Sequence, residues 1–395
     1  MNRSENAMPE PQSRNMMMVV CALLHGLNHS FNLILPPLYL SIRDDFGLDK
    51  LSLVTLFGTV YFFTYAAMNL PFGILADKYS KKKILVYGAV LNSIAFIIAG
   101  WTKSYHVFLF TMLLAGLGGG TYHPVANAMI SNLFKGMVGR AFGFIGMGAS
   151  IGLFVGPFLS GLIGQQFGWR VSCLSFGIFG CLAAAGFSII MPDEGAFQSR
   201  EEHQSMPLKS FILALAPIVL VFGLRDFCFW GTTAMTPAMS QDIYGFSKQT
   251  AGLLLGLMSV TGVVSQPLAG TLSDRFGRRR VLAIALFIAG PILIFFPHFN
   301  HILIFPAALI AGSMVLCTVP VVDATLADVI HPSLRGRMYG ITLTIGLLIG
   351  AFSPFVTGLA YDYEGGYRLA YILLGAFALA SAVMTSVIPA KRPHA

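Results

Sequence analysis

Apolar residues along this chain fall into long runs between short polar segments, without the every-second-residue alternation of an amphipathic strand. The run Ile84–Trp101, for example, is long enough to cross about 30 Å of hydrocarbon as a helix. Because the membrane interior offers no water to backbone amides, only helices and closed barrels span it, and the missing alternation argues against a barrel. The pattern predicts an all-α membrane protein.

The runs number twelve, and an even number places both termini on one side of the membrane. They cover residues 16–42, 51–75, 83–101, 106–132, 140–164, 170–192, 210–238, 247–271, 280–297, 301–329, 338–361 and 368–389. We therefore expect, in order, a tail at 1–15, a six-helix bundle at 16–192, a linker at 193–209, a second six-helix bundle at 210–389 and a tail at 390–395.

Composition supports a membrane protein and limits its chemistry. Charged residues make up 11% of the 395 residues, against about 25% in soluble domains. The polar N-terminal segment lacks the apolar core of a signal peptide, so we expect it to remain as a cytoplasmic tail. The five cysteines lie in apolar runs without CxxC spacing, which predicts no disulfide framework and no metal site. We expect no cofactor.

Basic residues collect on one side of the predicted bundle. Of the 25 lysines and arginines, 18 lie in the two tails and in alternate loops, six lie in the opposite loops, and one, Arg225, lies inside a run. This asymmetry follows the positive-inside rule, so both termini are predicted to be cytoplasmic. The same placement argues against a nucleic-acid partner.

The two halves of the chain repeat each other. The stretch GILADKYSKKK, Gly73–Lys83, returns 197 residues later as GTLSDRFGRRR, Gly270–Arg280. The same separation matches Asp45 with Asp242, Pro157 with Pro354 and Gly161 with Gly358. Two parallel six-helix halves with a substrate site at their interface are a known transporter plan.

These phrases resemble the loop between helices 2 and 3 that marks the major facilitator superfamily, and the resemblance covers essentially the whole chain. It implies a conformational latch in which Asp77 lies against the eleventh run near Gly340, and Asp274 lies against the fifth run near Gly143. The alternative is that the basic residues only set topology. The residues assigned to the latch are Gly73, Asp77, Lys81, Gly270, Asp274 and Arg278.

The fifth run carries glycines and a proline that resemble the motif of the superfamily's drug–proton antiporters: Gly143, Gly152, Gly156, Pro157 and Gly161. Ser160 replaces the first glycine of the final pair in that motif. Glycines four residues apart allow close helix packing. The resemblance implies export rather than import, although import stays open.

Polar side chains inside two runs are the candidates for substrate binding or proton coupling. His25, Asn28, His29 and Asn32 share one helix face, which favours a cavity-facing stripe over interhelical hydrogen bonding alone. The 197-residue separation places Arg225 and Asp226 at the positions of Asn28 and His29. Charges at this depth indicate a functional site, and the alternative is a structural ion pair.

Further candidates lie in the fourth, seventh and tenth runs. His123 and Asn127 share a face of the fourth, Trp230 lies one turn beyond Asp226, and Asp323 lies inside the tenth. His123 is a candidate proton relay because histidine titrates near neutral pH, and packing is the alternative. Aromatic residues at helical spacing are more often packing residues, so Trp230 is the weakest candidate.

The segments Leu24–Leu40 and Tyr122–Pro124 resemble the corresponding sequences of the fosmidomycin-resistance branch of the superfamily. That branch places an acid after the asparagine of the first stretch, where this chain has His29. The arginine that many drug–proton antiporters carry before the glycines of the fourth run is also absent from TMLLAGLGGG. Any proton coupling must therefore use other groups.

The expected function is secondary-active transport by alternating access, with proton-coupled export of a small organic compound or drug as the preferred form. The alternatives are a proton-linked importer of an organic anion or sugar and, more remotely, a membrane receptor or scaffold. No nucleophile–base–orienter grouping indicates an enzyme. We expect a monomer in the lipid bilayer of a bacterial inner membrane, with a small-molecule substrate.

Overall fold

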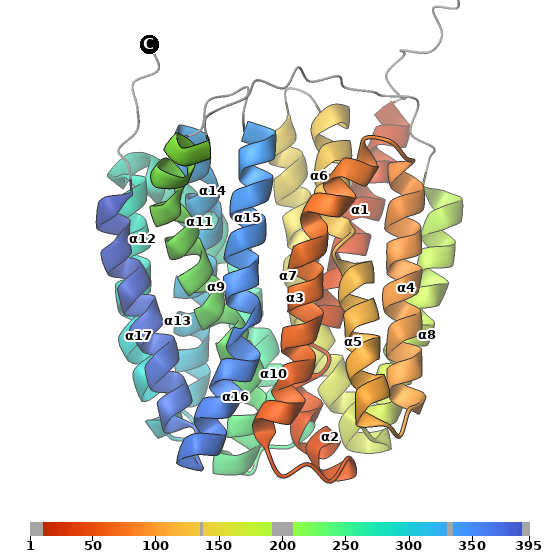
Figure 1. The fold of residues 1–395 in the computed structure, drawn as a ribbon, viewed down its shortest axis with the longest axis vertical. Coiled ribbons are helices and arrows are strands. Elements are labelled where there is room, and N and C mark those ends of the chain that lie inside the picture. Colours follow the sequence, from red (N-terminus) through yellow and green to blue (C-terminus); the bar gives the residue numbers. More distant parts are fainter. Residues whose placement is uncertain (1–10, 135–136, 192–207, 330–334, 389–395) are drawn as a thin grey trace, which may run out of the picture.

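The computed structural model describes residues 11–134, 137–191, 208–329 and 335–388. The predicted tails and linker therefore lie largely outside the described residues. The first half consists of the following helices (Figure 1): α1 (Pro11–Asn32), η1 (Pro36–Leu38), α2 (Tyr39–Asp45), α3 (Leu51–Ala76), α4 (Lys81–Trp101), α5 (Tyr105–Gly119), α6 (Tyr122–Leu133), α7 (Val138–Phe167) and α8 (Trp169–Ile190).

The second half repeats this arrangement with its own helices. They are α9 (Leu208–Tyr244), α10 (Lys248–Val260), α11 (Gly262–Phe276), α12 (Arg278–Phe295), η2 (Phe296–His298), α13 (Ile304–Leu316), α14 (Thr318–Val329), α15 (Arg335–Ala351), α16 (Ser353–Glu364), α17 (Arg368–Met384) and η4 (Thr385–Val387). The fold is the predicted one: twelve spans in two pseudo-symmetric six-helix bundles.

Eleven of the twelve spans are helical stretches long and apolar enough to cross a membrane. Three of these stretches consist of two helices separated by one residue: α10 and α11, α13 and α14, and α15 and α16. The twelfth span is divided by two residues, Gly120 and Thr121, into α5 and α6, and neither piece reaches membrane length alone. The first span is also interrupted, because α1 ends at Asn32 and a 3₁₀ turn begins at Pro36. Pro36 and Pro37 lack amide hydrogens, so they cannot continue the hydrogen bonding of α1.

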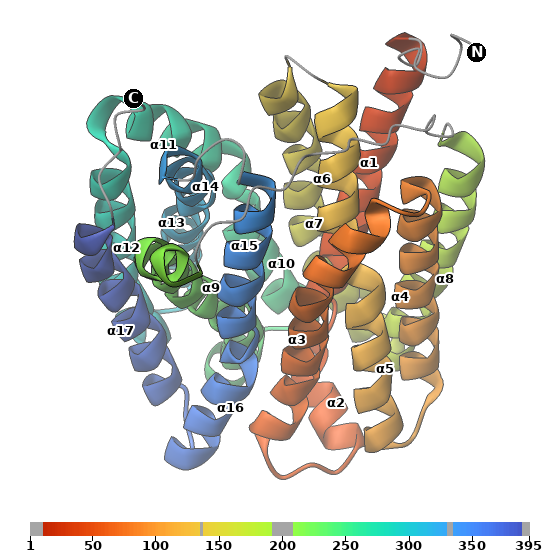
Figure 2. The ribbon, with the colours of Figure 1, turned by 45° about the horizontal axis from the view of Figure 1, so that its top comes forward.

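Figure 2 shows the two bundles diverging toward the end where α3 joins α4 and α11 joins α12. We call this the basic end, because both basic phrases lie there. A Cβ added at Gly143 or Gly146 on α7, or at Gly340 on α15, would meet no atom within 4 Å. Among the described residues, hydrogen bonds between the halves lie instead toward the other end, which we call the far end. The structure is thus open at the basic end and closed at the far end.

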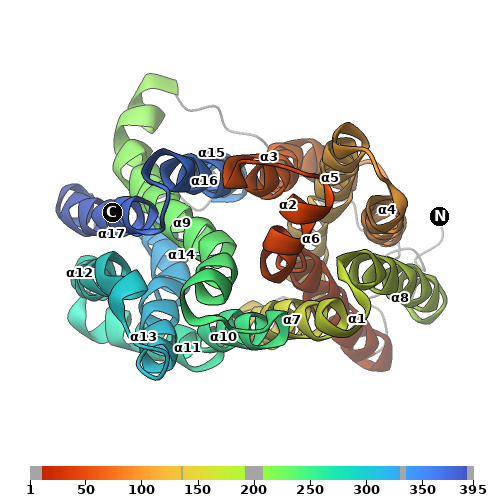
Figure 3. The ribbon, with the colours of Figure 1, turned by 90° about the horizontal axis from the view of Figure 1, so that it is seen from below.

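Two seams hold the halves together. Figure 3, viewed along the bundle, shows α7 beside α10 in one seam and α3 beside α15 and α16 in the other. Four inner helices, α1 and α6 from the first half and α9 and α14 from the second, lie between the seams. The residues predicted to bind substrate or carry protons all lie on these inner helices.

At the far end, each seam is closed by a side chain that caps a helix of the other half. The Asp362 carboxylate on α16 accepts hydrogen bonds from the Leu51 and Ser52 amides at the start of α3, at 2.8 and 3.1 Å. The Gln165 side chain on α7 accepts one from the Lys248 amide at the start of α10, at 3.1 Å. The 197-residue repeat relates the two acceptors, Gln165 and Asp362, and also the two donors, Leu51 and Lys248. Each cap satisfies first-turn amides that have no partner inside their own helix.

Glycines let α7 lie directly against both neighbours. A Cβ on any of three glycines would collide with the backbone of α1, and the colliding pairs are Gly148–Ala22, Gly152–Gly26 and Gly156–Ser30. Beyond them, a Cβ at Gly161 would collide with the Lys248 carbonyl oxygen of α10, and the Pro157 carbonyl oxygen occupies the space beside Gly252. The motif therefore packs α7 against its own half and against the other half.

We predict that Gly152→Ala destabilises the protein by about 1–3 kcal/mol, because the added methyl group forces two backbones apart. Gly146→Ala is the matched control on the same helix, since its Cβ meets open space and alanine favours the helix by about 1 kcal/mol. Thermal unfolding in detergent measures both. Equal melting temperatures for the two variants would contradict the packing role.

We predict that Asp362→Ala opens the far end more often, because it removes an acceptor and a charge at a helix N-terminus. The loss of about 1 kcal/mol corresponds to a roughly fivefold shift in the conformational equilibrium. A cysteine placed at Thr55, which is fully buried in this seam, reports the shift as faster labelling by a membrane-impermeant maleimide. Glu364→Ala is the control, because Glu364 caps Leu369 within its own half and should leave labelling unchanged.

Candidate functional site

The polar face of α1 points into the first half, where neighbouring helices hold it. The Asn28 side chain donates to the Gly119 carbonyl at 2.9 Å and accepts from the Tyr65 hydroxyl at 3.1 Å. Asn32 accepts from the Tyr61 hydroxyl at 2.8 Å. Both asparagines are buried, so they make the interhelical hydrogen bonds that the sequence left as an alternative.

Three histidines from α1 and α6 form one cluster. The ring centroids of His25 and His29 are 4.7 Å apart, and that of His123 lies 5.1 Å from the first and 5.5 Å from the second. Tyr122 stacks on His25 at 4.5 Å. His25 is nearly fully buried, whereas the other two are partly exposed. Asn127, one turn further along α6, is also partly exposed.

In the second half, Arg225 and Asp226 on α9 form an ion pair at 2.7 Å and are 4% and 3% exposed. The guanidinium lies over the Phe222 ring at 4.7 Å. Arg225 Nε and Asp226 Oδ2 have no hydrogen-bond partner among the described residues. The pair therefore neutralises its charge but leaves a donor and an acceptor unused at membrane depth.

Asp323 on α14 belongs to the same charged group. It is partly exposed, and its carboxylate lies close enough to Asp226 for their charges to interact. Trp230, one turn along α9 from Asp226, packs on Phe62 of α3 with ring centroids 4.0 Å apart. This tryptophan therefore sits against the opposite half beside the charged group.

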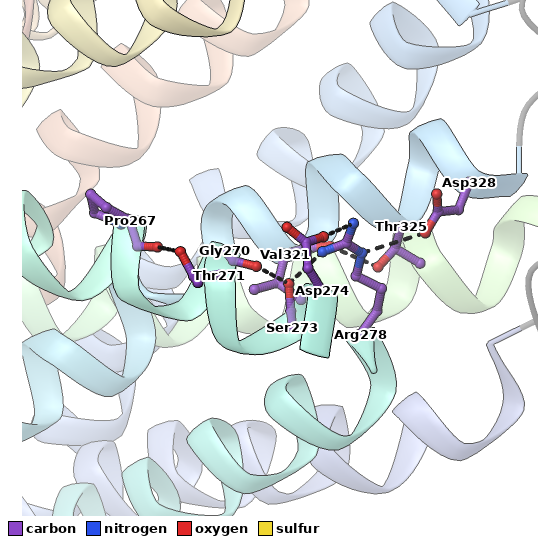
Figure 4. Close-up of polar contacts among 9 residues, drawn as sticks. All are labelled: Pro267, Gly270, Thr271, Ser273, Asp274, Arg278, Val321, Thr325 and Asp328. Atoms are coloured by element: carbon purple, nitrogen blue, oxygen red, sulfur yellow. Dashed lines mark hydrogen bonds and ion pairs between the residues drawn. The ribbon is translucent and has the colours of Figure 1, made fainter. Parts of the chain in front are cut away.

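The second basic phrase ties three helices together (Figure 4). Arg278 pairs with Asp274 at 2.5 Å and with Asp328 at 3.4 Å, and it donates to the Ser273 hydroxyl at 2.5 Å. It thereby joins the end of α11 and the end of α14 to the start of α12. Arg278, which pairs with Asp274, and the other partners of Arg278 lie in the second half, and Gly143 of α7 faces open space. The expected approach of Asp274 to α7 remains a prediction for a conformation closed at the basic end.

The first basic phrase lies at the same end of the other half. Asp77 ends α3 and is exposed, and Lys81 begins α4 and is partly exposed. A Cβ at Gly73 would make ordinary contact with Pro124 at 3.7 Å, and one at Gly270 would meet nothing within 4 Å. Neither glycine is in tight contact with another helix in this conformation.

Sequence reasoning did not single out the groups that hold the site. Tyr61 and Tyr122 were missed, although Tyr61 lies one turn from Tyr65 on the same face of its run. Gln165 and Asp362 were also missed as far-end caps. The 197-residue repeat would have paired these two positions, but not shown that they face helix starts.

Comparison with known proteins identifies the fold and its general activity. The sequence profile of the Major Facilitator Superfamily matches residues 18–264 and 218–395, so the chain belongs to this superfamily. It is a multi-pass membrane transporter, and its relatives are transporters rather than enzymes.

Individual relatives cover most of the chain. The multidrug resistance protein MdtG of Klebsiella pneumoniae strain 342 is 25% identical over 93% of this chain and 91% of its own length. A probable L-galactonate transporter of Escherichia coli K12 is 21% identical over 87% and 82%. The fold is similar to the inward-facing, occupied structure of a bacterial homologue of the human lysosomal transporter Spinster, with a TM-score of 0.82 and 17% identity over 96% and 97%.

We predict that Arg225→Met destabilises the protein by roughly 3–5 kcal/mol when Asp226 stays charged, because it leaves a buried carboxylate unpaired. The double variant Arg225→Met, Asp226→Leu should recover most of this loss. Arg43→Met is the control, because its pair with Asp44 is partly exposed and contributes about 0–1 kcal/mol. Thermal unfolding of the wild type, Arg225→Met, Asp226→Leu and the double variant checks the cycle, and additive losses would contradict the coupling.

Proposed function

We propose that this protein is a proton-coupled exporter of a small organic compound, working by alternating access in a bacterial inner membrane. In this proposal the basic end faces the cytoplasm, following the positive-inside rule, and both termini are cytoplasmic. The conformation described above is then open to the cytoplasm. The protein acts as a monomer in the bilayer, without nucleic acid or cofactor.

The observation that carries proton coupling is the environment of Asp226. Its carboxylate is 3% exposed and lies 2.7 Å from Arg225, and a second acid, Asp323, lies on α14 of the same half. Burial disfavours a charged carboxylate and a neighbouring cation favours it, so the proton occupancy of such an acid changes when its surroundings change. Rocking of one half against the other changes what faces this group from the first half, because Trp230, one turn away, packs on Phe62 of α3.

Export is supported by two independent features. The glycine–proline pattern of α7 resembles that of drug–proton antiporters, and it packs α7 against α1 and α10. The similar protein MdtG bears the name of a multidrug resistance protein. A site with few fixed charges in the first half and one ion pair in the second suits small amphipathic or anionic compounds.

A second candidate, proton-linked import of an organic anion, rests on Arg225. Its Nε donor has no hydrogen-bond partner among the described residues, and guanidinium binds carboxylates through paired hydrogen bonds. The similar E. coli protein is named as a probable transporter of L-galactonate, an organic anion.

We predict that fosmidomycin moves opposite to protons across proteoliposomes with an imposed pH gradient, and that Asp226→Asn lowers this gradient-driven transport at least tenfold. Asp44→Asn is the control, because Asp44 is an exposed acid far from the site. Labelled fosmidomycin inside the vesicles is the measured quantity.

The outcomes separate the candidates. Movement of galactonate together with protons, lost in Arg225→Met, would favour the importer. Transport that ignores the pH gradient in the wild-type protein would overturn proton coupling in both forms.

A further inference from the structure

His25 has a buried ring nitrogen with nothing to bind. Its Nδ1 lies 3.0 Å from the Ile145 carbonyl oxygen, and a carbonyl only accepts, so Nδ1 carries the proton. The other nitrogen, Nε2, then has a free lone pair, is buried and has no hydrogen-bond partner among the described residues. An unsatisfied acceptor at this depth costs about 1–3 kcal/mol.

The rings of His29 and His123 lie beside His25. One ring nitrogen from each of His25, His29 and His123 lies within 4.8 Å of the chosen nitrogens of the other two. A tetrahedral ion with bonds of about 2.0–2.1 Å places its ligand nitrogens roughly 3.4 Å apart. Coordination therefore requires the partly exposed rings of His29 and His123 to turn toward His25.

The outer hydrogen bonds of the cluster also fit metal ligation. A ligating histidine almost always donates its second ring N–H to a carbonyl, a carboxylate or water, as His25 does to Ile145. The Asn32 amide nitrogen lies 3.2 Å from Nδ1 of His29, and turning this amide by 180° presents its oxygen instead, so that Nδ1 donates and Nε2 is free to bind a metal ion. Tyr61, the other partner of Asn32, both donates and accepts, so it permits either amide orientation.

We propose that His25, His29 and His123 form a binding site for a divalent transition metal ion of the zinc, cobalt or nickel class, held by three neutral imidazoles. Imidazole suits these ions, and three protein ligands leave a fourth position open. Because neutral ligands leave the full double charge of the ion, the open position binds an anionic ligand. The site is confined to the first half and does not depend on the direction of transport proposed above.

The test is cobalt binding to the purified protein in detergent, using an affinity tag without histidine. We expect one Co²⁺ per chain, with the intense visible absorption of a tetrahedral site, and displacement of that signal by Zn²⁺. His29→Gln and His123→Gln, on separate helices, should each weaken binding at least tenfold. His106→Gln, an exposed histidine of α5 in the same half, should bind as the wild type does.

Thermal unfolding provides a second readout. Zn²⁺ should raise the melting temperature of the wild type and of His106→Gln, but not that of the two cluster variants, because only ions bound to the native state stabilise it. Melting without metal shows whether each variant folds. Binding that is absent, or equal in His29→Gln, His123→Gln and the wild type, overturns the proposal.

Discussion

The two halves depend on helix starts in one half being capped by side chains of the other. First-turn amides need acceptors outside their own helix, and near the membrane surface water supplies them poorly once the seam closes. Asp362 and Gln165 supply these acceptors from opposite halves and at equivalent positions of the repeat. The closed end is therefore held by polar contacts that water replaces when the seam opens. This makes the closure reversible, as alternating access requires.

The inner helices use one scaffold for two kinds of chemistry. At equivalent positions the first half carries Asn28 and His29, whereas the second carries Arg225 and Asp226. Asn28 hydrogen-bonds to Tyr65 and to the Gly119 carbonyl, and His29 makes ring contacts with His25 and His123. Arg225 and Asp226 pair with each other. Charge inside the membrane is thus concentrated in one half. A substrate or ion between the halves meets donors and metal ligands on one side and an ion pair on the other.

At the basic end, the segment Gly270–Arg280 can make different contacts in the open and closed conformations. In the open state Arg278 holds Asp274 within its own half, together with Asp328 of α14. Gly143 and Gly340 on the opposing helices face open space, so room is left for the halves to approach. Closure at this end would exchange contacts inside one half for contacts between halves.

The sequence by itself determined the membrane class, the twelve spans, the twofold repeat and the residues that carry charge at membrane depth. These follow from run length, from the 197-residue separation and from the cost of charge in hydrocarbon, all of which can be read from the order of residues without knowing how the helices pack. Only the tertiary structure decided which groups meet. His123 joins His25 from a helix 98 residues away, and Asp362 reaches Leu51 across 311 residues. Such contacts depend on how helices pack against each other, which periodicity within one helix does not specify.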